Sequence, residues 1–362
     1  MVIYRKYRPQ KFSDVIGQEY VVRTLENEIK QDKVAHAYLL TGPRGLGKTT
    51  LARLIAKAVN CQNRKAGESE PCNKCANCLD LTQGKFYDLL EMDAASQTGV
   101  DNVRENIIAG TRVPPSRGKY KIFIIDEVHM LSTPAFNALL KTLEEPPPYI
   151  IFILATTEIH KVPDTIISRC QRFDLTKVDL GKIILRLKKI ITSEKAKVAP
   201  EVLTAIARRS EGCVRDAESI LSQILIFDGQ EITMEEASLV IPSTKSNLIT
   251  KFVELLLAKE KRELLLKINQ LLEEGIDLEQ FTKDLIEFLR KVLLVKVGAD
   301  EGRILQYLDN EAQKMVRTFA AGFDQAVLIK IIEEFISVQQ ELSYAEIPQL
   351  PLELAAVKLC SS

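Results

Sequence analysis

The stretch that decides the fold of this 362-residue chain is Gly42-Pro43-Arg44-Gly45-Leu46-Gly47-Lys48-Thr49. It matches the pattern G-x-x-x-x-G-K-[ST] at every fixed position, follows an apolar run at 37–40 and opens a helical pattern. In that context backbone N–H groups of the loop and the helix N-terminus attract phosphate oxygens. We therefore expect Lys48 to reach the β and γ phosphates of a nucleotide and Thr49 to hold Mg²⁺. The alternative is a glycine-rich turn that binds no ligand.

A second stretch places two acids at the end of a buried strand. The apolar run 121–125 is followed directly by Asp126 and Glu127. Because ligands of open α/β sheets bind beyond the carboxyl ends of the strands, we expect Asp126 to bind Mg²⁺ through water and Glu127 to act as general base. The alternative is an exposed acidic turn. After the next apolar run, 150–155, the hydroxyl of Thr157 could orient the attacking water.

Composition excludes several classes of protein. With 46% hydrophobic and 27% charged residues, the chain can form packed cores and is not a disordered protein. The 49 Lys and Arg balance the 49 Asp and Glu, so binding to nucleic acid would need local patches. We find no apolar run of about 18 residues and no signal peptide, which predicts a cytoplasmic protein without a membrane segment.

The order of the patterns predicts an α/β domain followed by helices. Apolar runs at 37–40, 88–92, 121–125 and 150–155 alternate with helical patterns, as in a parallel sheet covered on both faces. Later segments are amphipathic helices or a linker: helices at 180–195, 201–209 and 214–227, and a polar linker at 242–247. A further helix has one apolar stripe, formed by Leu278, Phe281, Leu285, Phe288, Leu289 and Val292.

Four of the seven cysteines form a cluster in the sequence, C-x10-C-x2-C-x2-C, made by Cys61, Cys72, Cys75 and Cys78. Four thiolates without a nearby histidine suit a closed structural Zn²⁺ site with no position left for water. An iron–sulfur cluster and unmetallated thiols are the alternatives. The other cysteines are expected in core packing, and the three histidines are expected to be structural: Cys170, Cys213, Cys360, His36, His129 and His160.

Together these motifs resemble the AAA+ ATPases of the clamp-loader branch and, more narrowly, the γ/τ subunits of bacterial DNA polymerase III. The resemblance rests on the segments 42–49, Asp126-Glu127-Val128-His129, Thr157 and Ser168-Arg169-Cys170. It extends to segments elsewhere in the chain: Tyr7-Arg8-Pro9, Val15-Ile16-Gly17-Gln18, 36–39, Asp93-Ala94-Ala95-Ser96, 136–147 and Glu341-Leu342-Ser343-Tyr344-Ala345. It covers essentially the whole chain, densely in the first 220 residues and sparsely after them.

The resemblance implies a role for each matching residue. In the family the lysine and acid pair, here Lys48, Asp126 and Glu127, hydrolyse ATP, and Thr157 corresponds to the sensor 1 position. Arg169 would act in trans on the ATP of a neighbouring subunit, and Arg215 corresponds to the sensor 2 arginine. An arginine that arrives only on assembly can raise the hydrolysis rate about 10³- to 10⁵-fold.

The expected ATP-binding residues follow from the same resemblance. They are Arg8, Pro9, Val15, Ile16, Gly17, Gly42, Pro43, Arg44, Gly45, Leu46, Gly47, Lys48, Thr49, Thr50 and Arg215. The first five belong to the loop that encloses adenine in the family.

The implied fold is an α/β AAA+ P-loop NTPase domain at 1–177 with a zinc-binding insertion at about 61–78, an all-α lid at 178–242 and an all-α oligomerisation collar at 243–362. The implied function is that of a clamp-loader ATPase of DNA polymerase III, part of a DNA-directed DNA polymerase complex at the replisome. ATP, Mg²⁺ and Zn²⁺ are the implied cofactors. The implied partners are δ- and δ′-type subunits, further copies of the chain, the sliding clamp β and primed DNA.

Contacts to DNA are expected at phosphates, from helix N-termini and scattered cations. Candidates are Ser132-Thr133-Pro134, Lys141, Asn102 and Arg104, with ordinary helix capping as the alternative. Gln97 and Gly99 stand where family members often carry basic residues, which weakens the expected contact. The basic run Arg5, Lys6, Arg8 and Lys11 could lie beside the nucleotide or beside DNA.

Three other functions compete with clamp loading. A helicase such as a branch-migration motor belongs to the same motor class, and a non-hydrolysing replisome scaffold belongs to another. Intact Lys48, Asp126 and Glu127 argue against the scaffold. A small-molecule phosphoryl kinase would have no use for Arg169 in trans.

Overall fold

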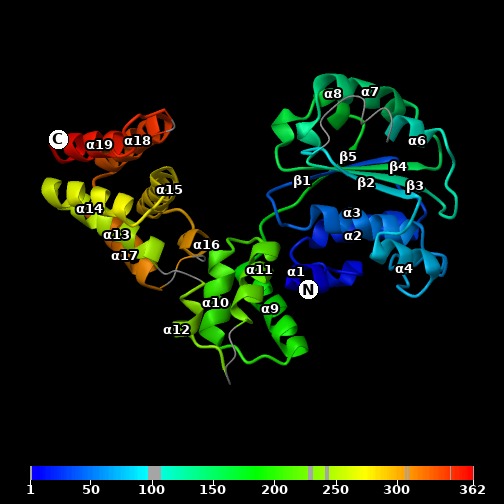
Figure 1. Ribbon diagram of the computed structural model, residues 1–362, viewed down its shortest axis with the longest axis horizontal. Coiled ribbons are helices and arrows are strands. Elements are labelled where there is room, and N and C mark those ends of the chain that lie inside the picture. Colours follow the sequence, from blue (N-terminus) through cyan, green and yellow to red (C-terminus); the bar gives the residue numbers. More distant parts are fainter. Residues whose placement is uncertain are drawn as a thin grey trace. The chain divides into compact units, whose positions relative to one another are not determined.

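The computed structural model describes residues 2–96, 107–226, 231–240, 244–305, 308, 310–342 and 344–361. They form two compact units (Figure 1). The first unit comprises Met1–Val198 and Ser210–Glu231, and the second comprises Ala199–Arg209 and Ile232–Ser362. The candidate residues named above for nucleotide and metal binding all belong to the first unit.

The first unit is built on a parallel sheet with the strand order β2-β3-β4-β1-β5. The strands are β1 (Ala37–Thr41), β2 (Leu89–Asp93), β3 (Lys121–Asp126), β4 (Ile150–Thr156) and β5 (Gln171–Asp174). Since all pairs are parallel, the carboxyl ends of β1, β3 and β4 meet at one edge of the sheet. A parallel α/β sheet followed by helices confirms the predicted fold class at this level.

Four strands lie where the apolar runs predicted them, and the fifth was not predicted. All five residues of β1 and all seven of β4 are buried, as expected for strands covered on both faces. In β5 only Phe173 is buried, and the strand pairs with β1 alone. An edge strand with one buried side chain carries too little hydrophobic pattern to be recognised in the sequence.

Helices cover both faces of the sheet (Figure 1). One face packs on α2 (Glu19–Lys30) and α3 (Lys48–Val59), which contribute Leu25 and Leu51 to its core. The other face packs on α7 (Thr133–Glu144) and α8 (Asp164–Ile167). The remaining helices of this unit are α1 (Ile3–Lys6), η1 (Phe12–Asp14), α4 (Ala76–Gln83), α6 (Ala109–Thr111), η3 (Val128–Met130), η4 (Ile159–Lys161), α9 (Leu180–Glu194) and α11 (Val214–Ile224).

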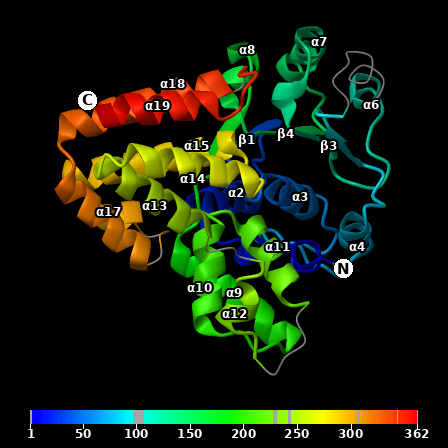
Figure 2. The same cartoon turned by 60° about the vertical axis from the view of Figure 1, so that its left-hand side comes forward.

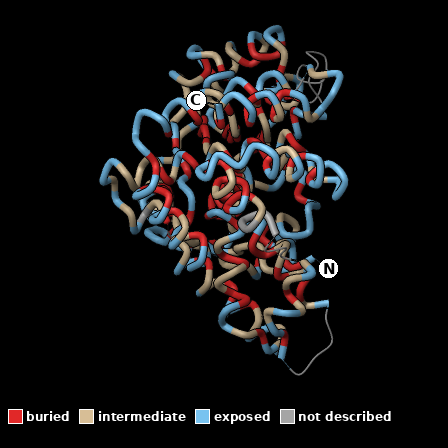
Figure 3. Tube along the Cα trace, turned by 90° about the vertical axis from the view of Figure 1, so that its left-hand side faces the viewer, coloured by how far each residue is buried: buried red, intermediate tan, exposed pale blue. Residues whose placement is uncertain are grey.

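The second unit consists of helices joined by short turns in its described residues, with a single bridge residue at Ile232 (Figure 2). Its helices are α10 (Pro200–Arg209), α12 (Met234–Ala237), α13 (Thr244–Leu257), α14 (Lys261–Glu273), α15 (Leu278–Lys296), α16 (Glu301–Leu305), α17 (Asn310–Gly322), α18 (Gln325–Leu342) and α19 (Leu350–Ser361). The six residues of the stripe predicted on α15 are all buried in its core. Figure 3 shows buried and exposed positions alternating along the helices, as amphipathic packing requires.

The helices predicted over 180–195, 201–209 and 214–227 are present, and the last of them is shorter than predicted. Part of the predicted linker is helical. The helix expected over 214–227 corresponds to α11, which ends at Ile224. Residues 241–243 lie outside the described residues, and α13 already begins at Thr244, so a linker extending to Asn247 was wrong. The division into domains at 177 and 242 stays a prediction.

No helix among the described residues is both long enough and apolar enough to span a membrane.

We predict that Leu285→Ala lowers the free energy of unfolding of the second unit by about 2–5 kcal/mol, because Leu285 is fully buried and the substitution leaves a cavity. Leu266→Ala is the matched control, since that side chain is 54% exposed and should change stability by less than about 0.5 kcal/mol. Urea unfolding followed by circular dichroism measures both. Equal losses in the two variants would contradict the packing of α15.

Candidate nucleotide-binding site

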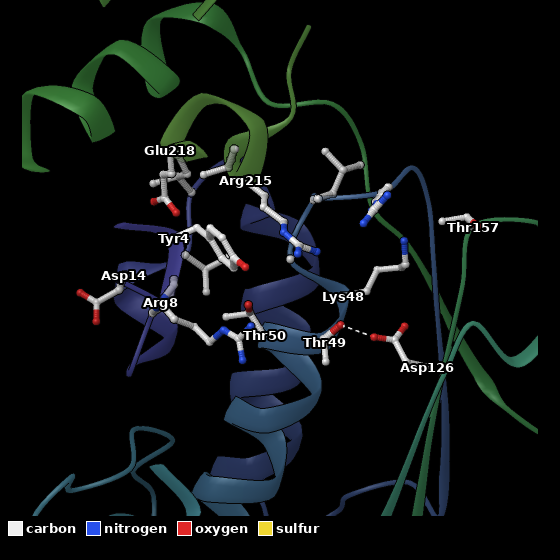
Figure 4. Close-up of a pocket in the computed structure, with 18 of the residues that line it drawn as sticks. Tyr4, Arg8, Asp14, Lys48, Thr49, Thr50, Asp126, Thr157, Arg215 and Glu218 are labelled. Carbon is white, nitrogen blue, oxygen red and sulfur yellow. Dashed lines mark hydrogen bonds between the residues drawn. The ribbon is translucent and has the colours of Figure 1, made fainter. Parts of the chain in front are cut away.

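A cavity of about 680 Å³ opens at the carboxyl edge of the sheet. The phosphate loop, the start of α3 and the ends of β3 and β4 contribute one end of its lining, and the N-terminal segment and α11 contribute the other (Figure 4). Its lining residues are Tyr4, Arg8, Pro9, Asp14, Val15, Ile16, Arg44, Gly45, Leu46, Gly47, Lys48, Thr49, Thr50, Asp93, Ala95, Asp126, Glu127, Thr157, Arg186, Val214, Arg215 and Glu218. A site of this size and polarity suits a nucleotide.

The loop 42–47 owes its path to its glycines. Gly42, Gly45 and Gly47 have φ values of 134°, 79° and 101°, which side chains rarely adopt. At Gly45 space is also lacking, since a Cβ there would lie 2.2 Å from Cys213 Sγ and 3.2 Å from Arg215 Cβ. The loop can therefore approach α11 only because this residue is glycine.

The Lys48 ammonium folds back onto its own loop. Its Nζ donates to Gly42 O at 2.6 Å and to Pro43 O at 3.0 Å, and the residue is only 6% exposed. Burial lowers the pKa of Lys48, and the nearby carboxylates of Glu127 and Asp126 act in the opposite direction. An anion in the cavity would stabilise this desolvated charge, as the predicted phosphate role requires.

The two acids after β3 are held in different ways. Asp126 Oδ2 accepts a hydrogen bond from Thr49 Oγ1 at 2.6 Å, which places both predicted Mg²⁺ ligands side by side (Figure 4). Glu127 adopts a left-handed backbone conformation, φ 47°, and its Oε2 accepts a hydrogen bond from Thr157 Oγ1 at 3.0 Å. Strained non-glycine residues of this kind are concentrated at functional sites. The structure thus joins Asp126, Glu127, Thr49 and Thr157 in one network.

His129 belongs to this network, although the sequence pattern assigned it only a structural role. Its Nδ1 lies 3.0 Å from Thr156 Oγ1 and 3.5 Å from Glu127 Oε2, and its Nε2 lies 3.2 Å from Glu158 Oε1. The ring is nearly buried beside the predicted general base. Its position three residues after Asp126 was the only available signal, and it is too weak to identify a contact.

Positive charge dominates the opposite wall of the cavity. The guanidinium of Arg215 lies 4.7 Å from the centre of the Tyr4 ring, which is a cation–π contact. Hydrogen bonding to Arg215, and then to Arg5, lowers the pKa of Tyr4. Burial lowers the pKa of Arg8. Among the described residues, neither Arg8, Arg44 nor Arg215 forms an ion pair. Cations without carboxylate partners make the cavity a favourable place for a polyphosphate.

A buried ion pair closes the base of this wall. Arg186 Nε on α9 donates to Glu218 Oε1 on α11 at 2.9 Å, and the two side chains are only 12% and 6% exposed. Arg186 also donates to the carbonyl of Tyr7. Burial raises the pKa of Glu218, and the Arg186 charge opposes that rise. The pair joins α9, α11 and the N-terminal segment around the cavity.

Most residues predicted to bind nucleotide line this one cavity. The residues that do so are Arg8, Pro9, Val15, Ile16, 44–50, Asp126, Glu127, Thr157 and Arg215. Gly17, Gly42 and Pro43 do not. Gly17 packs against Val178, and the carbonyls of Gly42 and Pro43 hold Lys48. The sequence reasoning missed Tyr4, Asp14, Arg186 and Glu218, because isolated residues without a motif offer no signal.

Arg169 does not line the cavity of its own chain. It follows α8, where its Nη2 lies 2.6 Å from Glu144 Oε1 and its Nη1 donates to Thr165 O at 2.7 Å. The guanidinium is one-third exposed and can be reached from outside. This placement is compatible with a role of Arg169 in trans, which stays a prediction.

The four predicted metal ligands come together. The sulfur atoms of Cys61, Cys72, Cys75 and Cys78 all lie within 4.8 Å of one another. Backbone N–H groups point at them: Cys72 N lies 3.3 Å from Cys61 Sγ, and Cys75 N lies 3.3 Å from Cys72 Sγ. Tetrahedral Zn²⁺ with bonds of about 2.3 Å needs sulfur atoms about 3.8 Å apart, so this cluster fits a metal ion of that kind.

The remaining candidates are placed less clearly. Ser132 caps α7 by accepting from Ala135 N at 3.4 Å, which is the capping role named as the alternative to a DNA contact. Lys141 is exposed on the same helix. Gln97, Gly99, Asn102 and Arg104 lie outside the described residues.

Two family models match the chain in different regions. The model described as "DNA polymerase III, delta subunit" matches residues 17–179, and the one described as "DNA polymerase III subunits gamma and tau domain III" matches residues 235–362. Together they span the sheet and most of the second unit.

Curated relatives match over nearly the whole chain. It is 42% identical over 360 residues to DNA polymerase III subunit tau of Bacillus subtilis, which covers 99% of this chain and 63% of that protein. Subunit tau of Escherichia coli is 35% identical, with 99% and 55% covered. Subunit gamma of Buchnera aphidicola subsp. Acyrthosiphon pisum is 33% identical, with 100% and 99% covered. The chain thus spans little more than half the length of these tau subunits and essentially all of this gamma subunit.

Solved structures show a more distant likeness. The clamp loader delta protein of Bacillus subtilis is 16% identical with a TM-score of 0.44, covering 93% of this chain and 98% of that chain. At this level of likeness it supports no statement about function.

We predict that Gly45→Ala weakens nucleotide binding at least tenfold, because the methyl group collides with Cys213 Sγ and forces the loop to move. Titration with a fluorescent ATP analogue measures the change. Gly275→Ala is the control: it has a similar φ of 69° but open space around it, so it should cost stability without changing nucleotide affinity.

The double variant Gly45→Ala/Cys213→Ala removes the colliding sulfur and should recover part of the lost affinity. Equal affinities for the wild type and Gly45→Ala would show that the cavity is not where nucleotide binds.

Proposed function

The chain belongs to the gamma/tau family of DNA polymerase III subunits, and we propose from this premise that it is a clamp-loader ATPase. It would bind ATP, open the sliding clamp β and place it on primed DNA, with hydrolysis releasing the complex. The proposed site of action is the replisome in the cytoplasm. The observation that carries the ATPase proposal is the convergence of Lys48, Thr49, Asp126 and Glu127 in one cavity.

The phosphate chemistry can be assigned to individual side chains. Loop amides and Lys48 would neutralise the β and γ phosphates, and Thr49 and Asp126 would hold Mg²⁺, which supplies further neutralising charge when it is bound. Glu127 would accept a proton from the attacking water. The Thr157 hydroxyl fixes Glu127 Oε2, so it would keep that carboxylate oriented.

The cationic wall would bind the other parts of the nucleotide. Arg215 would reach the phosphates from α11, supported by its contact with Tyr4. Residues 8–16 would enclose the adenine, since Arg8, Pro9, Val15 and Ile16 line the far end of the cavity. Because the wall carries helices α9 and α11, ATP could draw these helices toward the loop and so act as a conformational ligand.

Arg169 would complete a neighbour's site. Its one-third exposed guanidinium is held by Glu144 of α7 and Thr165 of α8, and it does not line its own chain's cavity. Such an arginine would stabilise charge on the transferred phosphoryl group only after assembly. Hydrolysis would then report that the ring is complete.

The second unit would form the oligomerisation collar. Two of its helices, α18 and α19, and the residues before α19 carry exposed apolar side chains: Val327, Ile329, Ile336, Tyr344, Ile347, Leu350, Leu354 and Val357. Exposed apolar side chains in this number favour burial against other subunits. The proposed neighbours are copies of this chain and δ- and δ′-type subunits.

The thiol cluster would hold one structural Zn²⁺. Four sulfur ligands leave no open position, so the ion would stabilise the segment 61–78 and not take part in hydrolysis. Iron in an iron–sulfur cluster is the remaining alternative for these ligands.

Trans complementation tests the shared site. We predict that Arg169→Ala and Lys48→Met each abolish most ATPase activity of the assembled loader, and that mixing the two variants restores part of it. In mixed assemblies an intact Lys48 pocket meets an intact Arg169 from its neighbour. Arg172→Ala is the matched control, because this exposed arginine pairs only with Asp174 among the described residues and should not matter.

Failure of the mixture to regain activity, with assembly intact, would contradict the trans role. Wild-type turnover by isolated Arg169→Ala chains would favour a phosphoryl kinase. ATPase activity that is stimulated by the clamp and primed DNA, without strand displacement, would separate a loader from a helicase. A protein that hydrolyses no ATP at all would favour the scaffold.

Metal analysis tests the thiol cluster. We expect one zinc per chain in the wild type and loss of that zinc in Cys72→Ser, because this removes one of four ligands. Cys170→Ser is the control and should retain the zinc. Iron in the purified protein would contradict the assignment.

A further inference from the structure

The thiol-cluster segment, 61–78, is bonded directly to the loop that lines the cavity. Glu70 Oε2 accepts a hydrogen bond from Phe12 N at 2.9 Å, and Glu70 Oε1 accepts one from Ser13 N at 2.8 Å. Asn73 Nδ2 donates to Gln10 O at 3.1 Å. Three backbone groups of residues 10–13 are thus satisfied by two side chains that lie about 60 residues away in sequence.

These bonds act on a segment with cavity-lining residues on both sides. Arg8 and Pro9 precede it and Asp14, Val15 and Ile16 follow it, and all five line the cavity. Gln10 Nε2 also donates to Arg8 O at 3.0 Å. Fixing residues 10–13 therefore fixes both ends of the loop proposed to enclose the base.

The same two side chains depend on the thiol cluster. Asn73 lies between Cys72 and Cys75 and has a left-handed φ of 59°. The next residue, Lys74, donates its N–H to Cys72 Sγ at 3.4 Å. Among residues 61–75 there is no helix or strand. Glu70 and Asn73 lie two residues before and one residue after the ligand Cys72. A metal bound to that sulfur would therefore fix both residues, together with the hydrogen bond from Ser69 Oγ to Glu26 Oε1 at 2.9 Å.

A third contact runs through the helix that follows the phosphate loop. Lys57 Nζ, on α3, donates to Gln10 Oε1 at 2.7 Å and to Thr82 Oγ1 on α4 at 2.7 Å. Lys57 is 5% exposed, so these bonds are shielded from water. Gln10 is thereby held by the phosphate-loop helix, by α4 and by the cluster segment together.

We propose that Glu70 and Asn73 are positioning residues for nucleotide binding: through them, the metal-held segment 61–78 sets the shape of the base-enclosing loop. This rests on the proposed function, because it assumes that nucleotide binds in this cavity. It gives the metal a consequence for the affinity of ATP and not only for folding. By linkage, nucleotide must tighten metal binding by the same factor.

The test compares nucleotide affinity in variants that keep their zinc. In Glu70→Gln/Asn73→Asp both side chains keep their size. Residue 70 loses one of its two acceptor oxygens, and residue 73 loses its N–H donor. We expect a non-hydrolysable fluorescent ATP analogue to bind this variant at least about fivefold more weakly than the wild type. Glu68→Gln is the matched control in the same segment, since among the described residues its carboxylate accepts only a long hydrogen bond, from Lys65 N at 3.5 Å.

Two further measurements make the result specific. Removing zinc with a chelator that is then dialysed away should weaken analogue binding to the wild type by a similar factor, and should add little in the double variant. Amide hydrogen exchange at Phe12 and Ser13 should speed up in both cases, because their N–H groups lose Glu70 as acceptor.

Two results overturn the proposal. The first is an affinity for the analogue that is unchanged in the zinc-loaded double variant. The second is a further loss of affinity when zinc is removed from the double variant, as large as the loss in the wild type. If the wild type binds no analogue, the proposed function fails instead. The exchange rates at Phe12 and Ser13 then still decide whether the segment holds the loop.

Discussion

The rest of the site depends on one constraint, which is that β1 lies between β4 and β5 with every strand parallel. This order brings the loop after β1 next to the ends of β3 and β4. The Thr49 hydroxyl then meets Asp126 at 2.6 Å, although 77 residues separate them in sequence. No local pattern could produce that contact, and without it neither cation binding nor a general base near the phosphates would be possible.

Several costly features concentrate at this edge of the sheet. Lys48 is buried and donates to two loop carbonyls, and Glu127 has a left-handed backbone. In the part of the chain that the structure describes, Arg8 and Arg215 line the cavity without forming ion pairs. Each lowers stability unless something compensates for it. A magnesium–nucleotide complex would compensate the charges of Lys48, Arg8 and Arg215 with its phosphates, and its cation would meet the carboxylate of Asp126. The proposed function gives these features a common cause.

The sequence was informative where a pattern is local. Continuous apolar runs predicted β1, β3 and β4, and the spacing of Cys61, Cys72, Cys75 and Cys78 predicted their cluster. It was silent where the fold joins distant residues. The edge strand β5 buries too few side chains to be recognised, and Tyr4, Arg186 and Glu218 reach the cavity only after the N-terminal segment, α9 and α11 pack together. Glu70 and Asn73 escaped notice for the same reason.

We propose that the nucleotide is held between the phosphate loop and the wall formed by the N-terminal segment and α11, and that a neighbouring subunit completes catalysis. The most direct test is a structure of the assembled protein with Mg²⁺ and a non-hydrolysable ATP analogue. The account predicts phosphates on the amides of 45–49, the base against residues 8–16, and a neighbour's Arg169 beside the γ phosphate. A neighbour's Arg169 guanidinium that lies more than roughly 7 Å from the γ phosphate would contradict the shared site.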